Sequence, residues 1–171
     1  MLKHPTESSF PPWLPPIVPS SSVNWEKHLN LLFRYFKKEF IDSKPEFREL
    51  NVLLKKFPDQ TDTFHPTFWH IISEGVDEIN RIPEISRCER IRWPRPIIEH
   101  ENEPNMLVWE NVRRGNKSVC IDFEEIEYLV VLGKRKGYLI LTTAYPIDSN
   151  HSKYKLLKEY KAYQQESHIK S

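Results

Sequence analysis

The sequence predicts an α+β fold in which N-terminal helices pack on a four-stranded antiparallel sheet and a C-terminal helix closes the domain. Three observations support this prediction. Apolar residues follow helical spacing in the first half of the chain, four short β-branched and aromatic runs occupy 106–145, and a helical pattern returns over 151–165. With 171 residues, 39% of them apolar, the chain is long enough for one domain with its own core.

Residues 1–22 are predicted to form a Pro-rich extended arm. Six of the fourteen prolines lie between Pro5 and Pro19, where fixed φ angles and missing N–H groups disfavour helix and sheet. Two interpretations remain open: the arm lies in a groove on the body, or it is a ligand for a proline-binding partner. The rest of the chain, 23–171, is expected to form a single α+β domain.

Three helices are expected before the sheet. Residues 23–41 place bulky apolar side chains at helical spacing behind a polar start, and a shorter pattern of the same kind follows over 46–57. The third helix, over 66–81, opens with proline at the favourable first position. Residues 86–93 have room for two helical turns, and the two prolines that follow predict an extended exit.

The strands expected after this point are joined by short polar turns. Their β-branched and aromatic residues favour antiparallel pairing between neighbours, over 106–113, 118–123, 128–133 and 138–145.

Basic residues are expected to gather at one end of that sheet. In a meander the first and third turns lie at the same end, and both of these turns are basic. They supply Arg113, Lys117 and Arg135 as candidate contacts to the backbone of a polyanion, for which RNA is the commonest choice. The competing interpretation is that charged hairpin tips merely discourage pairing of strand edges.

Several classes of protein are not favoured. The N-terminus lacks the unbroken apolar segment of a signal peptide, and no stretch approaches the roughly 18 apolar residues that span a bilayer. Cys88 and Cys120 form no CxxC pair, which favours a reduced, cytoplasmic protein. Glycine-rich phosphate loops, GxSxG and HExxH motifs are missing, so neither a cofactor nor a metal is expected.

An arginine-rich segment is unexpected in a chain whose formal net charge is only +1. Residues 87–96, RCERIRWPRP, hold four arginines, and His70 precedes them on the polar face of the third expected helix. One metal-free chemistry uses such groups. A base removes the proton of an RNA 2'-hydroxyl, arginines hold the charge that develops at phosphorus, and a 2',3'-cyclic phosphate remains.

Glu74 is the carboxylate expected to orient His70, because it follows four residues later on the same helical face. A solvated surface contact between the two side chains is the alternative.

The succession of segments resembles a group of nuclease families. The chain is similar to the prophage and toxin-associated members of the barnase/EndoU/colicin/RelE group over roughly residues 64–163. The similarity lies in the order of FWHIISEG (68–75), RCERIRW (87–93), LVWEN (107–111), EYLVVLGKRKGYLILTTAY (127–145) and a lysine-rich final helix. It implies a metal-independent endoribonuclease built of helices on an antiparallel sheet.

The resemblance also implies roles for single residues. His70 is the implied base or acid, and Arg87 and Arg90 are the implied phosphate clamp. Thr143 and Tyr145 carry hydroxyls that would position the phosphate or supply the second proton-transfer group.

Two tryptophans are candidate platforms for a splayed base, Trp93 and Trp109. Burial of both indoles in the core is the competing interpretation.

The expected partners are RNA, either tRNA or mRNA, and an antitoxin or immunity protein; no membrane is expected. Two alternatives to the nuclease remain: a non-catalytic RNA-binding module that uses the same basic end, and a phage protein-interaction regulator that acts through the Pro-rich arm.

Overall fold

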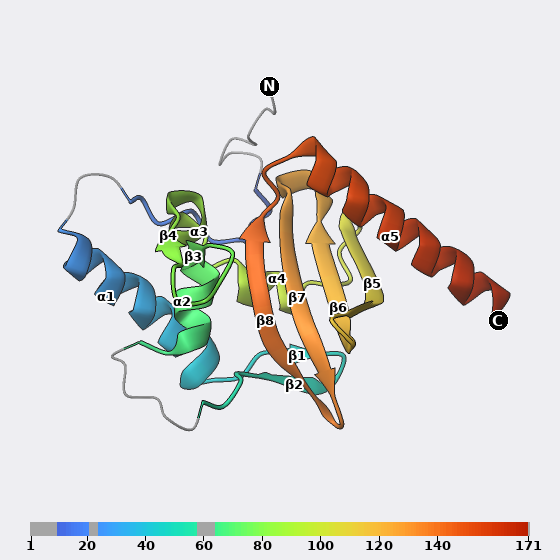
Figure 1. The fold of residues 1–171 in the computed structure, drawn as a ribbon, viewed down its shortest axis with the longest axis horizontal. Helices are drawn as coiled ribbons and strands as arrows, with labels where there is room; N and C mark the ends of the chain where they lie inside the picture. Colours follow the sequence, from blue (N-terminus) through green and yellow to red (C-terminus); the bar gives the residue numbers. More distant parts are fainter. Residues whose placement is uncertain (1–9, 21–23, 58–63, 171) are drawn as a thin grey trace.

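The structure is a computed structural model and describes residues 10–20, 24–57 and 64–170, apart from the side chain of Arg113. Figure 1 shows a curled sheet, a group of N-terminal helices beside one edge of it, and a long C-terminal helix that crosses the sheet near the opposite edge.

The C-terminal half forms the expected antiparallel meander. Its four strands pair in sequence and are β5 (Met106–Arg113), β6 (Asn116–Phe123), β7 (Tyr128–Arg135) and β8 (Tyr138–Pro146). A 3-10 turn, η3 (Glu124–Ile126), joins the middle pair.

A four-stranded antiparallel sheet was nevertheless the wrong prediction. The sheet has six strands in the order β1-β2-β8-β7-β6-β5, and a separate two-stranded sheet joins β3 (Ser73–Glu74) to β4 (Ile82–Pro83). The two added strands are β1 (Glu46–Phe47) and β2 (Leu50–Leu53). Because β2 runs parallel to β8, the sheet is mixed.

The expected helix over 46–57 is therefore replaced by a hairpin. Arg48 and Glu49 turn the chain with φ angles of 49° and 66°, a conformation that non-glycine residues adopt only where contacts support it. Arg48 makes such a contact, since it donates to both carboxylate oxygens of the buried Glu101 at 2.9 Å.

Five α-helices accompany the sheets in the described residues: α1 (Trp25–Phe36), α2 (Pro66–Ile72), α3 (Ile85–Glu89), α4 (Pro94–Glu99) and α5 (Asn150–Ile169). One π-helical turn, η2 (Lys37–Ile41), continues α1, so the helix expected over 23–41 is confirmed for its described part.

Two further expectations for this half of the chain were wrong. The helix expected over 66–81 ends at Ile72, where the chain enters the β3–β4 hairpin. The extended exit expected after the arginine segment is instead α4, with Pro94 and Pro96 both in its first turn. Proline is compatible with a helix there, because the first N–H groups have no intrahelical acceptor.

The two faces of the sheet support separate cores. The larger cluster joins the inner sides of α1 to α4 to residues such as Ile121, Val130 and Leu141. The smaller cluster lies under α5 and centres on Trp109, Leu129 and Leu156. In Figure 1, α5 crosses the sheet over β5 and β6, which leaves β8 beside α2.

The described part of the Pro-rich arm, residues 10–20, packs on the body. Trp13 stacks on His100 with ring centroids 4.2 Å apart, and Trp93 donates its indole N–H to the carbonyl oxygen of Pro15 at 2.9 Å. The backbone N–H of Val18 donates to Glu89 at 2.8 Å.

In the part of the chain that the structure describes, no helix combines the length and the apolar character that crossing a membrane requires.

Candidate functional site

Helix α2 delivers His70 to the edge of the sheet. The helix begins at Pro66, and His65 caps it by accepting the backbone N–H of Thr67 at its Nδ1 (3.1 Å). It ends after Ile72, because Ser73 turns into β3 and donates its hydroxyl to the carbonyl oxygen of Trp69. His70 therefore lies in the last helical turn, next to the hairpin.

Arg81, from the hairpin, fixes this junction. Its guanidinium donates to the carbonyl oxygens of His70 (3.0 Å) and Gly75 (3.3 Å), and to both the carbonyl and the hydroxyl of Ser73. Carbonyl oxygens in the last turn of a helix have no intrahelical N–H donor, and the guanidinium of Arg81 supplies the missing donors. Only 8% of the Arg81 side chain is exposed, so this guanidinium is part of the scaffold.

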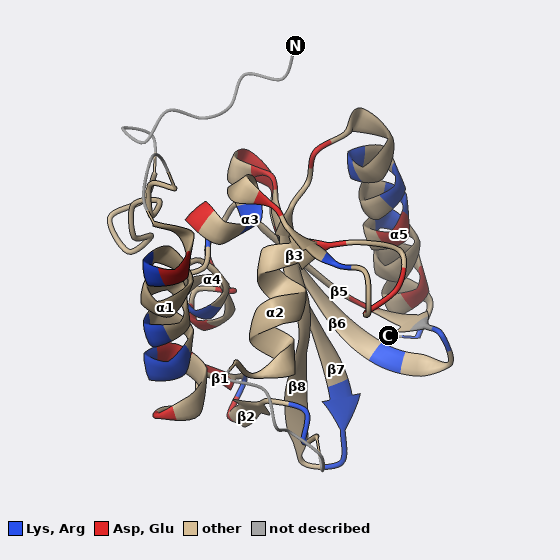
Figure 2. Cartoon of the chain, turned by 60° about the vertical axis from the view of Figure 1, so that its left-hand side comes forward, with Lys and Arg blue, Asp and Glu red and all other residues tan. Residues whose placement is uncertain are grey.

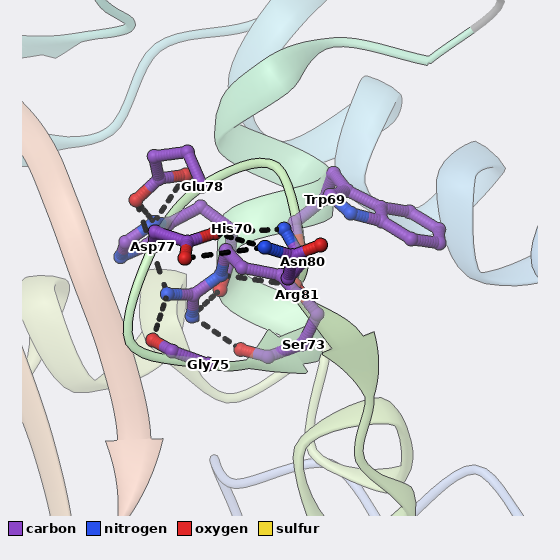
Figure 3. Close-up of polar contacts among 8 residues, drawn as sticks. All are labelled: Trp69, His70, Ser73, Gly75, Asp77, Glu78, Asn80 and Arg81. Atoms are coloured by element: carbon purple, nitrogen blue, oxygen red, sulfur yellow. Dashed lines mark hydrogen bonds and ion pairs between the residues drawn. The ribbon is translucent and has the colours of Figure 1, made fainter.

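The imidazole of His70 contacts a carboxylate, but not that of Glu74. Its Nδ1 lies 3.0 Å from Oε1 and 3.2 Å from Oε2 of Glu78, at the far end of the hairpin (Figure 3). A carboxylate can only accept, so in a neutral ring Nδ1 carries the proton. The lone pair then remains on Nε2, which is the arrangement that a general base requires.

The electrostatic surroundings of His70 favour this neutral ring. Burial lowers its pKa below the ordinary value of 6.5, the contact with Glu78 opposes that effect, and the cations Arg81 and Arg87 lower the pKa further. The imidazole is therefore mostly unprotonated at neutral pH.

Arg87 is the arginine of the 87–96 segment whose charge lowers the pKa of His70. Its guanidinium carbon lies 5.1 Å from the ring centroid of Tyr145, and its charge reaches His70. Among the described residues no carboxylate forms an ion pair with Arg87, although Glu84 accepts its backbone N–H. A half-buried cation without an ion-pair partner is suited to hold an anion.

The other arginines of the segment point elsewhere. Arg90 donates to the carbonyl of Ser86 (2.9 Å) and lies over the Trp93 ring. Arg95 pairs with Glu99 and donates to the carbonyl of Glu39, so it ties α4 to the π-helical turn.

Arg92 belongs to the same structural group, because its guanidinium carbon lies 4.8 Å from the ring centroid of Tyr35 in α1. The concentration of positive charge in the sequence therefore serves mainly to join helices, and of the four arginines Arg87 is the one whose charge lowers the pKa of His70.

A bulge in β8 decides which hydroxyls approach His70. Pairing shifts between Val131 and Leu132, so that Thr142 has no partner in β7. Thr143 and Tyr145 then share the face covered by α5, where they pair with Val131 and Leu129. Tyr145 meets Arg87 from that face, whereas Thr143 makes no contact with His70 in the described structure.

Neither candidate tryptophan is open to a base. Trp93 and Trp109 are each 1% exposed, and their indole N–H groups donate to Pro15 and to Glu159. Both rings are core residues in this structure.

The basic hairpin turns lie at one end of the sheet, as the meander requires, and Figure 2 shows basic residues around the turn after β7. Lys117 and Arg135 are exposed there, while Lys134 pairs with Glu110 at 2.6 Å. The backbone of Arg113 ends β5, and its side chain lies outside the described structure.

A groove of about 670 Å³ opens beside His70. Its described lining combines aromatic rings with a lysine and several polar groups: Lys55, Phe57, Phe64, Pro66, Thr67, Trp69, His70, Glu78 and Thr142. The volume is in the range of sites that hold small organic ligands.

The sequence did not single out four residues at this site, because the elements that carry them differ from the predicted ones: Lys55, Glu78, Arg81 and Thr142. Lys55 follows a strand read as helix, Glu78 and Arg81 belong to a hairpin read as helix, and Thr142 sits in a bulge. Gly75, followed by two acidic residues and Asn80, was the available signal that helix 66–81 would break early.

Among the described residues, no group of three histidine, cysteine or acidic side chains is arranged to hold a metal ion. Comparison with family models, with curated proteins and with solved structures gives no match for this chain.

Proposed function

We propose that this protein is a metal-independent endoribonuclease that cuts RNA through the 2'-hydroxyl and leaves a 2',3'-cyclic phosphate. The observation that carries the proposal is an imidazole held by Glu78, whose pKa is lowered in part by the charge of Arg87, a cation with no ion pair to a carboxylate among the described residues.

In the proposed step, Nε2 of His70 takes the proton of the 2'-hydroxyl as that oxygen bonds to phosphorus. The bond from phosphorus to the 5'-oxygen breaks, and that oxygen leaves with a proton from an acid. Arg87 holds the negative charge on the phosphoryl oxygens through its planar fork. Tyr145, whose ring centroid lies 5.1 Å from the guanidinium carbon of Arg87, is the group proposed to supply that proton.

Arg81 and Glu78 are positioning residues in this scheme. Arg81 holds the end of α2, and Glu78 holds the imidazole, so both act through His70 and not on the substrate. Arg90 and Thr143 have no part in the step, because their described contacts lie away from His70.

The cellular setting is part of the proposal. Cys88 and Cys120 are both buried and neither forms a disulfide, which favours a reducing compartment, and we place the protein in the cytoplasm with tRNA or mRNA as substrate. We propose an antitoxin or immunity protein as the partner that neutralises this activity in the cell that makes it.

The test is cleavage of RNA by purified protein in EDTA, with the ends of the products identified. We expect 2',3'-cyclic phosphate ends, and a loss of about 100-fold or more in rate for His70→Gln, the usual contribution of a general base. Arg87→Gln should lose activity as well. The matched control is His151→Gln, at an exposed position on α5.

Undiminished cleavage by His70→Gln would overturn the proposal, and so would activity that EDTA removes. Salt-sensitive RNA binding with no product at any protein concentration would favour the non-catalytic binding module instead.

A further inference from the structure

The groove beside His70 contains an aromatic ring that the core does not use. Phe64 packs on Phe33 and Phe68 with centroid distances of 5.1 and 5.3 Å, and Trp69 also packs against the larger core. Phe57 belongs to neither described core cluster and is only half-buried. The ammonium of Lys55 lies over this ring, His65 makes a T-shaped contact with it, and among the described residues the ring also lines the groove.

A cation lies next to this ring. The Nζ of Lys55 is 5.3 Å from the ring centroid of Phe57, and among the described residues Lys55 has no ion pair with a carboxylate. The groove's carboxylate, Glu78, is already held by His70 and lies 3.9 Å from Arg81. The groove therefore presents an aromatic ring with a positive charge over it, and this charge has no ion-pair partner among the described residues.

These properties select the class of ligand. A planar heterocycle stacks on an aromatic face, and a phosphate binds the neighbouring ammonium group, so the combination fits one unpaired nucleotide with its phosphate. A base that is paired in a duplex cannot offer its face to Phe57, because its neighbours cover it.

We infer that this groove is the subsite for an unpaired base beside the cleaved bond, with Phe57 as the stacking platform and Lys55 as the contact to the adjacent phosphate. The inference rests on the proposed function for the position of the cut. It makes single-stranded RNA, or an unpaired loop, the substrate class.

The experiment measures binding without cleavage. A short fluorescein-labelled RNA of mixed sequence, with a 2'-O-methyl group at every ribose, cannot be cut by the proposed step, and fluorescence anisotropy gives its affinity for the full chain. We expect Phe57→Ala to weaken binding by about tenfold or more, as for the loss of one base–aromatic stack. Annealing the oligonucleotide to its complement should weaken binding to a similar extent.

Matched controls come from α5, which lies outside the groove. Tyr154→Ala removes an exposed aromatic ring and Lys161→Ala removes an exposed lysine, and both should bind as the unaltered protein does. Phe57→Leu preserves apolar bulk without an aromatic face, so it should also bind weakly, and it tests stacking if Phe57→Ala fails to fold.

The outcomes separate the two proposals. Equal affinity of Phe57→Leu and the unaltered protein, or equal affinity for single strand and duplex, would overturn the subsite even if RNA is cut. Binding that depends on Phe57, with no cleavage of ordinary RNA by the unaltered protein, would preserve the subsite and overturn the nuclease.

Discussion

The protonation of His70 is set by opposing contacts, and Glu78 is the one that raises its pKa. A base must be unprotonated, so we expect kcat/KM to rise with pH and level off above the pKa of His70, which burial places below 6.5. Glu78→Gln removes the carboxylate that raises the pKa of His70. The rising part of the kcat/KM–pH curve should therefore move to lower pH, and the plateau value of kcat/KM should fall. The pH–rate profile measures both effects.

Glu74→Gln is the matched control, since Glu74 was the partner expected from helical spacing but lies exposed on β3. If Glu74→Gln shifted the rising part of the pH curve and Glu78→Gln did not, the contact between His70 and Glu78 would be contradicted.

Asp122 carries a second pH dependence, on stability. It is 5% exposed on β6, and burial raises its pKa from 3.8 to about 7. The folded state therefore binds this proton more tightly than the unfolded state does, and the associated stability is complete below about pH 4 and lost as the pH rises to about 7. The difference in pKa corresponds to roughly 4 kcal/mol as an upper bound.

Asp122→Asn should accordingly raise the Tm at pH 8 but not at pH 4, in thermal unfolding followed at both values. Asp148→Asn, at an exposed position, should change neither. An unchanged Tm at pH 8 for Asp122→Asn would contradict this prediction, because it would show that the ionised carboxylate of Asp122 does not destabilise the folded state.

Among the elements, the β3–β4 hairpin depends most on one side chain. Arg81 donates to three carbonyl oxygens and one hydroxyl, and lysine cannot reproduce that fork. We expect Arg81→Lys to cost about 1–3 kcal/mol and to reduce hydrogen-exchange protection of residues 73–83. Arg114→Lys, at an exposed turn, is the control; equal protection in both variants would refute this role.

The elements also show where sequence patterns suffice. The strands from β5 to β8 were predictable, because alternation and short turns are local signals. The β1–β2 hairpin was not, because its apolar residues fit a helix equally well and pairing with β8 decides the outcome. The roles predicted for His70 and Arg87 stay predictions, whereas Glu78 and Phe57 reach the groove by tertiary contacts that have no spacing signature.

For the molecule as a whole, the arm contributes to the core. Leu14 and Val18 are 5% and 7% exposed and belong to the larger cluster. Leu14→Ala should cost about 2–5 kcal/mol, as is usual for a buried leucine, and Val18→Ala should add to that cost. Chemical denaturation measures the change, with the exposed Pro16→Ala as control. If the Leu14→Ala, Val18→Ala double variant were as stable as Pro16→Ala, the arm would not contribute to the core, and binding of the arm to a separate partner would be favoured instead.

The parallel pairing of β2 with β8 joins segments that are far apart in the sequence. The groove is likewise lined by Lys55, shortly after β2, and by Thr142 in β8. Both walls of the groove can therefore meet only after β8 has been synthesised and has left the ribosome. We expect a nascent chain that has not yet extended past β8 to carry no assembled groove.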